Sequence, residues 1–111
     1  MTDRLTYWQQ RLRLVDWDID LEEVPSDAID GAAGRCVTWD SLGRARIRLA
    51  RVDTLPPEKV AIHSDQEATL VHELLHIRIP GDLKGGLSSD RQERGIEAIA
   101  QALVLMRRAE K

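Results

Sequence analysis

The chain has 111 residues, of which 42% are hydrophobic and 32% charged, and its formal net charge is −3 at pH 7. This composition is typical of one globular domain over residues 1–111, and the negative charge gives no electrostatic case for binding nucleic acid or an anionic membrane. The sequence has no run of about 18 apolar residues and no signal-peptide core, so we expect no membrane association. The single cysteine, Cys36, excludes an internal disulfide and fits a reducing cytoplasm, which is the expected location.

The first third of the chain predicts a helix followed by a strand. The helix covers residues 3–14, because Leu5, Trp8 and Leu12 fall on one face at helical spacing. The strand covers residues 16–22, where apolar and acidic side chains alternate as they do in a half-buried strand.

Two further strands are expected over residues 35–39 and 44–50, in a small sheet of three strands that is largely antiparallel. The second strand alternates sharply, with Ala45, Ile47 and Leu49 on one side and arginines on the other. At the edge of the sheet, this strand would be able to pair with an extended peptide, and its arginines would favour acidic substrates. We prefer the simpler interpretation that the arginines form a solvated face.

The second half of the chain is expected to be helical. Ser64 and Glu67 have the spacing of a capping box, which predicts a helix over residues 65–79. A loop over residues 82–88 separates it from a last helix, which is capped at residue 89 or 90 and runs to about residue 108. The order helix, small sheet, helix, helix indicates an α+β domain.

His72, Glu73 and His76 form an H-E-x-x-H pattern within the predicted helix, and this is the most specific chemical signal in the chain. Histidines four residues apart lie on one helical face, so their imidazoles can bind one Zn²⁺ while the glutamate reaches a water on the metal. The alternative is a pair of half-buried histidines that bind no metal. Chance seldom produces the pattern from only three histidines.

A catalytic zinc site needs a third protein ligand. Glu93 and Glu97 are the strongest candidates, because they lie one turn apart and Glu93 falls on the inner face of the last helix, between Ala100 and Val104. The same apolar side of the helix is expected to include Ile99. The alternatives are a capping role for Glu93 and a solvated position for Glu97. Cys36 is better explained as a small buried side chain, and His63 as a loop or capping residue.

These motifs together resemble the gluzincin metallopeptidases, and more closely their minimal, phage-type and ImmA/IrrE-like branch. The resemblance covers residues 64–106 and implies a zincin-like domain, in which a helix with H-E-x-x-H is followed by a helix that bears the glutamate ligand. It implies that Zn²⁺ is bound by His72, His76 and Glu93. It also implies that Glu73 is the general base and that Glu97 orients a ligand histidine.

The implied function is a zinc metallopeptidase, a hydrolase that cleaves a peptide or protein substrate. Zinc-bound water would attack the peptide carbonyl while Glu73 accepts its proton and passes it to the leaving amine. Larger gluzincins place a Tyr or His over the oxyanion, and the spare candidates here are Tyr7 and His63.

Two other hypotheses about the function remain open. The sequence does not indicate the oligomeric state. The first is a non-catalytic zinc-binding interaction or regulatory module of phage or mobile-element origin, in which the metal stabilises a small domain. A glutamate base beside the ligands argues against it. The second is a metal-free helical regulator, which requires the motif to be accidental.

Overall fold

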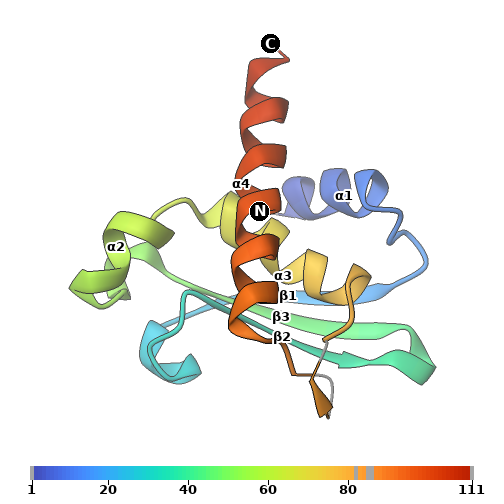
Figure 1. The fold of residues 1–111 in the computed structure, drawn as a ribbon, viewed down its shortest axis with the longest axis horizontal. Coiled ribbons are helices and arrows are strands. Elements are labelled where there is room, and N and C mark those ends of the chain that lie inside the picture. The colour runs from blue at the N-terminus through green and yellow to red at the C-terminus, as the bar shows by residue number, and fades with distance from the viewer. Residues whose placement is uncertain (1, 82, 85–86, 111) are drawn as a thin grey trace.

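The computed structural model describes residues 2–81, 83–84 and 87–110, and this part of the chain has the predicted α+β architecture (Figure 1). Its strands are β1 (Asp18–Val24), β2 (Gly34–Trp39) and β3 (Arg44–Ala50). Its α-helices are α1 (Thr2–Arg11), α2 (Pro57–His63), α3 (Gln66–Arg78) and α4 (Asp90–Ala109). No described helix is long and apolar enough to cross a membrane.

The strands form a mixed sheet in which β3 is the central strand. β3 pairs in parallel with β1 and antiparallel with β2. The sequence predicted a largely antiparallel sheet, and this prediction is wrong for the pair β1 and β3. The edge position considered for β3 is also wrong, because β3 is central. Gly43, with a φ of 62°, allows the tight turn that makes β2 and β3 antiparallel. The long path from β1 to β3 allows a parallel pairing.

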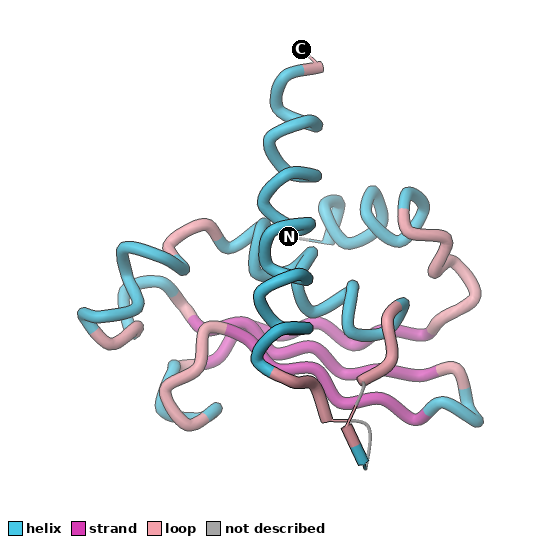
Figure 2. The backbone as a smooth tube through the Cα atoms, in the orientation of Figure 1, coloured by secondary structure: helices cyan, strands magenta, loops and turns pink. Residues whose placement is uncertain are grey.

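The alternation of β3 is confirmed. Ala45, Ile47 and Leu49 are buried, whereas Arg44 and Arg46 are exposed. A central strand alternates here because helices cover only one face of the sheet in the described part of the chain (Figure 2).

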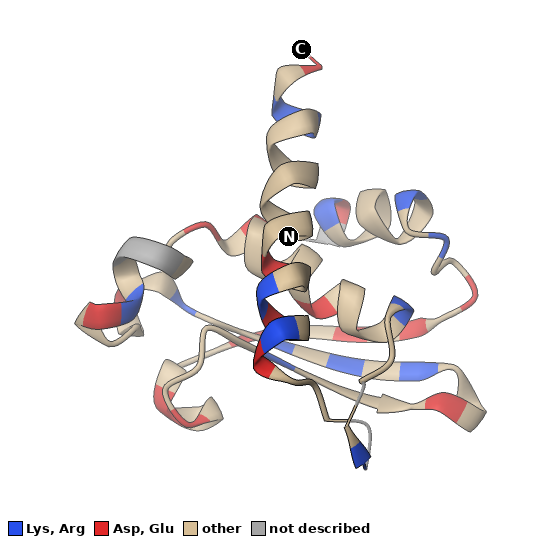
Figure 3. Ribbon diagram, viewed as in Figure 1, with Lys and Arg blue, Asp and Glu red and all other residues tan. Residues whose placement is uncertain are grey.

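The open face of the sheet carries a row of arginines on β3 beside a row of acids on β1 (Figure 3). Arg48 Nε lies 2.8 Å from Glu22 Oε1, and Arg44 Nε lies 3.5 Å from Asp18 Oδ2. Such exposed pairs contribute little to stability, but they leave this face charged and hydrated.

Helix α3 lies between the sheet and α4 and forms the centre of the core (Figure 1). Leu70, Val71 and Leu74 on this helix are completely buried. Helix α4 packs on α3 through a narrow buried stripe made of Ile96, Ala100 and Val104. Ile99, which the sequence placed on the inner face of α4, is 44% exposed instead, because the face that contacts α3 is narrower than the apolar part of the helix.

The start of α3 differs from the capping-box prediction. Its N-cap is Asp65, whose Oδ1 accepts a hydrogen bond from Ala68 N at 3.2 Å. Ser64 is the C-cap of α2, a helix that the sequence analysis missed. Pro57 begins α2 because the first helical residue needs no N–H donor.

The start of α4 agrees with the prediction, because Ser89 is its N-cap. In the predicted loop over residues 82–88, Asp82, Gly85 and Gly86 lie outside the described residues.

Glu67 does not cap α3 but forms a buried ion pair. It is 1% exposed, and it accepts hydrogen bonds from Trp8 Nε1 at 2.9 Å and from Arg107 Nη2 at 2.6 Å. Burial by itself raises the pKa of Glu67, but the hydrogen bonds from Arg107 and Trp8 outweigh it and hold the pKa below its ordinary value of 4.5. One carboxylate thus connects α1, α3 and α4.

We predict that Glu67→Gln lowers the free energy of unfolding by about 3 kcal/mol at pH 7, because the partly buried guanidinium of Arg107 loses its anionic partner. The folded-state pKa of Glu67 lies below its unfolded value of 4.5. The stability contribution of the carboxylate is therefore complete above that value and is lost as the pH falls through the folded-state pKa. Urea unfolding should show the difference between wild type and variant narrowing below pH 4.5.

The matched control is Glu58→Gln in α2, where the side chain is exposed. It should change the free energy of unfolding by less than about 0.5 kcal/mol. Equal losses in the two variants would contradict the structural role of the Glu67 ion pair.

Candidate metal centre

Helices α3 and α4 bring together the three predicted ligands, His72, His76 and Glu93, with one potential ligand atom of each within 4.8 Å of the others. Nε2 of His72 lies 3.1 Å from Glu93 Oε1, and Nε2 of His76 lies 3.0 Å from Glu93 Oε2. The two imidazole centroids are 5.0 Å apart, as expected for side chains one helical turn apart. The contact between the two helices therefore creates this cluster.

The three side chains lie close enough together to hold one cation. Ligand atoms at about 2.0–2.1 Å from a tetrahedral zinc ion lie roughly 3.3 Å from one another. The two His–Glu separations, 3.1 Å and 3.0 Å, are close to this value. Two imidazoles and a carboxylate are also a donor set of known catalytic zinc sites. Among the described residues, neither Cys36 nor His63, the other sequence candidates, belongs to this cluster.

Glu97 lies against the other nitrogen of His72. Its Oε1 is 2.7 Å from His72 Nδ1, and its Oε2 accepts a hydrogen bond from Gln101 Nε2 at 2.8 Å. A carboxylate at Nδ1 holds the proton on that nitrogen and leaves Nε2 free to bind a metal. The sequence analysis missed Gln101, although its position four residues after Glu97 on the same helix is a signal that could have found it.

The two histidines differ in their electrostatic surroundings. Burial by itself lowers the pKa of His72, but the carboxylates of Glu73, Glu97 and Glu93 outweigh this effect and raise the pKa. Burial of His76 holds its pKa below the ordinary value, against the opposing effect of Glu93. The cluster is thus rich in negative charge around His72.

Glu73 points toward the sheet and is only 7% exposed. Burial raises the pKa of Glu73 to about 7; His72 and Arg35 oppose this rise, and Glu93 adds to it. A carboxyl group whose pKa lies near neutrality can both accept and donate a proton at pH 7.

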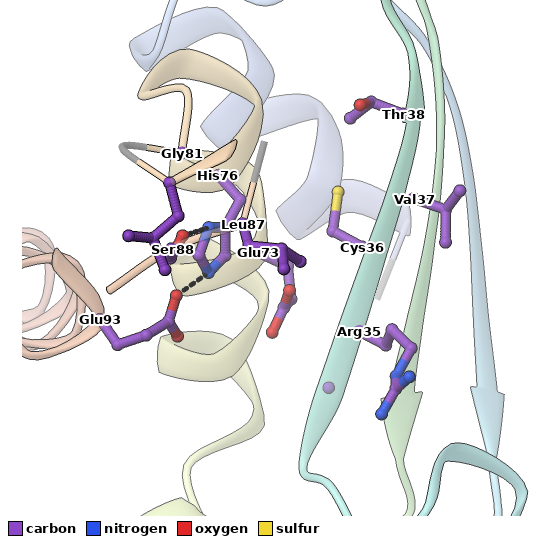
Figure 4. A pocket seen from close by; sticks show the side chains of 12 residues that line it. Arg35, Cys36, Val37, Thr38, Glu73, His76, Gly81, Leu87, Ser88 and Glu93 are labelled. Atoms are coloured by element: carbon purple, nitrogen blue, oxygen red, sulfur yellow. Dashed lines mark hydrogen bonds and ion pairs between the residues drawn. The ribbon is translucent and has the colours of Figure 1, made fainter. Parts of the chain in front are cut away.

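A cleft of about 620 Å³ lies between α3 and β2, beside the cluster (Figure 4). β2 is an edge strand within the described part of the sheet and forms one wall. The opposite wall includes Glu73, His76 and Glu93. Leu83, Leu87 and Ser88, from the segment between α3 and α4, also line the cleft.

Two residues of the cleft carried no recognisable signal in the sequence. Ser88 lies in a loop, and its Oγ is 3.5 Å from His76 Nδ1. Gly34 begins β2, and a Cβ built on it would lie 2.8 Å from Thr69 Cγ2 and 3.0 Å from Glu73 Oε2. Both contacts join segments that are distant in sequence, so local patterns do not indicate them.

Cys36 faces α3 from β2 across the cleft (Figure 4). Burial raises the pKa of the Cys36 thiol to about 12, and the charge of Glu73 adds to this effect. The thiol therefore remains protonated at neutral pH. The sequence analysis expected a small buried side chain, and Cys36 is partly buried.

No protein-family model, curated protein or solved structure matches this chain. The assignment of a function therefore depends on the chemistry and geometry of the residues described above.

We predict that Gly34→Ala lowers the free energy of unfolding by about 1–3 kcal/mol, because the new methyl group must push β2 away from Thr69 and Glu73. Urea unfolding measures this loss. Gly95→Ala in α4 is the matched control, because a Cβ at Gly95 would meet no atom within 4 Å. It should raise stability by up to about 1 kcal/mol through helix propensity. Equal effects at the two glycines would contradict the close approach at Gly34.

Proposed function

We propose that this protein is a zinc-dependent metallopeptidase with a minimal zincin-like layout. The observation that carries the proposal is the convergence of His72, His76 and Glu93 beside the buried carboxyl of Glu73, at the wall of a cleft. A purely structural zinc site is closed by four protein ligands and needs no base next to it. Three ligands and a neighbouring glutamate are the composition that a hydrolytic site requires.

Each residue has a separate task in this proposal. His72, His76 and Glu93 hold the cation, and Glu97 fixes the tautomer of His72 through its Nδ1. When bound, zinc polarises a carbonyl group and lowers the pKa of water in its coordination sphere to about 7. Glu73 accepts the proton of the attacking water and then delivers it to the leaving amine.

The substrate would lie along β2, because the free backbone edge of this strand borders the cleft. An extended peptide that pairs with an edge strand gains main-chain hydrogen bonds with little dependence on its sequence. In this proposal β2 takes the role that the sequence analysis considered for β3. The peptide carbonyl would then face Glu73 and His76 on the opposite wall of the cleft.

One observation favours the non-catalytic alternative, in which the metal site belongs to an interaction or regulatory module. Among the described residues that line the cleft, there is no tyrosine and no histidine other than His76. Tyr7 lies in α1 beside Trp8 and Arg11, and His63 ends α2. Stabilisation of an oxyanion would therefore depend on the cation or on other groups.

Glu73→Gln separates catalysis from metal binding. Wild type and variant should each bind one zinc ion per chain by elemental analysis, because Glu73 is not a ligand. Cleavage of a broad peptide library, followed by mass spectrometry, should fall at least about 100-fold in the variant, because the general base is lost.

Glu58→Gln, on the exposed surface of α2, is the control and should cleave as wild type does. Zinc binding by both the wild type and the Glu73→Gln variant, without cleavage by either, would favour the non-catalytic module. Failure of the wild-type chain to bind zinc after reconstitution would overturn both functions.

Glu93→Ala and Glu97→Ala test which acid is the third ligand. We expect the larger loss of zinc affinity for Glu93→Ala, because its two oxygens face Nε2 of both histidines. Glu97→Ala should weaken binding by roughly 10–100-fold, which is typical for the loss of a group that orients a ligand histidine. Competition with a chromophoric chelator measures both constants. A larger loss at Glu97 would reassign the third ligand.

A further inference from the structure

The outer face of α4 is apolar along most of its length. Seven residues form this face, which we call the α4 seam: Gly95, Ala98, Ile99, Ala102, Leu105, Met106 and Ala109. At 100° per residue the seam lies opposite the stripe that packs on α3. All seven are exposed, and Leu105 and Met106 are each 63% exposed. The middle of α4 is accordingly free of charged residues (Figure 3).

No contact within the described part of the chain requires glycine at position 95. Glycine in a helix interior is less favourable than alanine by about 1 kcal/mol. A Cβ at Gly95 would meet no atom within 4 Å, in contrast to Gly34. A glycine in this position allows a second backbone to approach the helix closely.

We propose that the α4 seam binds the α4 seam of a second copy of this chain, as an antiparallel helix pair with its two-fold axis at Ala102. The central line of the seam consists of Gly95, Ala102 and Ala109, which recur every seven residues. This spacing is the period of a helix pair that supercoils along one seam. Small residues on this line let the two helices approach closely.

The flanks of the seam are self-complementary in the antiparallel orientation. Rotation about Ala102 sets Ala98 beside Leu105 of the partner subunit, so that a large side chain meets a small one. Ile99 lies beside Met106 of the partner subunit on the other flank. The apolar side chains that are exposed in the single chain thus cover one another.

Charge selects the antiparallel orientation. Arg91 continues the seam line at the amino-terminal end, and Glu110 follows α4 at the other end. Both are exposed, and neither forms an ion pair within the part of the chain that the structure describes. Antiparallel pairing brings Arg91 near Glu110 of the partner subunit, whereas parallel pairing would set two Arg91 side chains together. Antiparallel helices also have opposed macrodipoles.

The pairing leaves the candidate metal centre open, because Glu93 and Glu97 point from the opposite face of α4 toward α3. A helix of 20 residues is about 30 Å long, so the contact is at the small end of specific interfaces. We therefore expect a reversible dimer with a dissociation constant on the order of 10 µM.

Sedimentation equilibrium of the full chain, over a wide range of concentration, tests the dimer. Ala102→Glu sets two carboxylates together on the two-fold axis and should raise the dissociation constant by on the order of a hundredfold. Leu42→Glu is the control, because Leu42 is 66% exposed outside α4 and should leave the constant unchanged. A wild-type chain that stays monomeric well above about 10 µM, or an Ala102→Glu variant that associates like wild type, would overturn the proposal.

Gly95→Leu is a second test of the dimer for the case in which Ala102→Glu does not fold. Leucine is the better helix former, so the variant should be at least as stable as wild type by urea unfolding and yet associate more weakly. A dissociation constant equal to that of wild type would overturn the proposal that the two α4 helices approach closely at Gly95.

Cysteine cross-linking in a Cys36→Ser background tests the orientation. Ala102→Cys should form a disulfide with its own copy, because the two-fold axis passes this position. Ala98→Cys should cross-link to Leu105→Cys in a mixture but not to itself. Cross-linking of Ala98→Cys to itself would indicate a parallel pair and contradict the proposal.

Discussion

The packing of α4 on α3 is the contact on which the candidate site depends. Helix α3 supplies both imidazoles and α4 supplies the carboxylates, so the cluster exists only while the two helices keep their relative position. The buried stripe around Ala100 fixes their separation, and the ion pair between Glu67 and Arg107 fixes their position along the axis. Glu67 therefore matters to the candidate metal centre although it lies outside it. A helix pair fixed by a buried stripe and an ion pair can hold ligands in place.

The electrostatics of the candidate site would favour the binding of a cation. Glu73, Glu93 and Glu97 lie close to His72, and burial of Glu73 makes its charged form costly. This cost appears as the raised pKa of Glu73, and the surrounding carboxylates raise the pKa of His72 against the effect of burial. A divalent cation between the helices would offset the repulsion among the carboxylates directly. The net charge of the chain is only −3, so its composition does not indicate this local concentration of carboxylates.

The parts that were predictable from sequence are those that depend on a single element. His72 and His76 lie one turn apart on one helix, and Glu93 was assigned to the inner face of the next, both from local spacing. That the two helices meet at these residues was implied by the family resemblance and not by spacing. The central position of β3 was not predictable. The alternation of apolar and charged residues indicates which face of the strand is buried, but it does not indicate which strands pair with it. The contact of Gly34 with Glu73 joins β2 to α3, and no local pattern encodes it. Asp65 replaced Ser64 as the cap of α3 because α2, which the sequence analysis missed, extends up to Ser64.

The two faces of α4 carry different physical requirements, and this explains its composition. The inner face must combine carboxylates with small and branched apolar residues, because it both packs on α3 and contributes to the cluster. The outer face has no such demand, and a solvated helix would be expected to carry charged residues there. Exposure of Ile99, Leu105 and Met106 to water is unfavourable, and no residue in the described part of the chain covers them. The open face of the sheet differs, because its arginines are balanced by acids on β1. Compared with the open face of the sheet, the outer face of α4 therefore has the exposed apolar side chains that a partner would cover. Such a partner would leave the edge of β2 free for substrate.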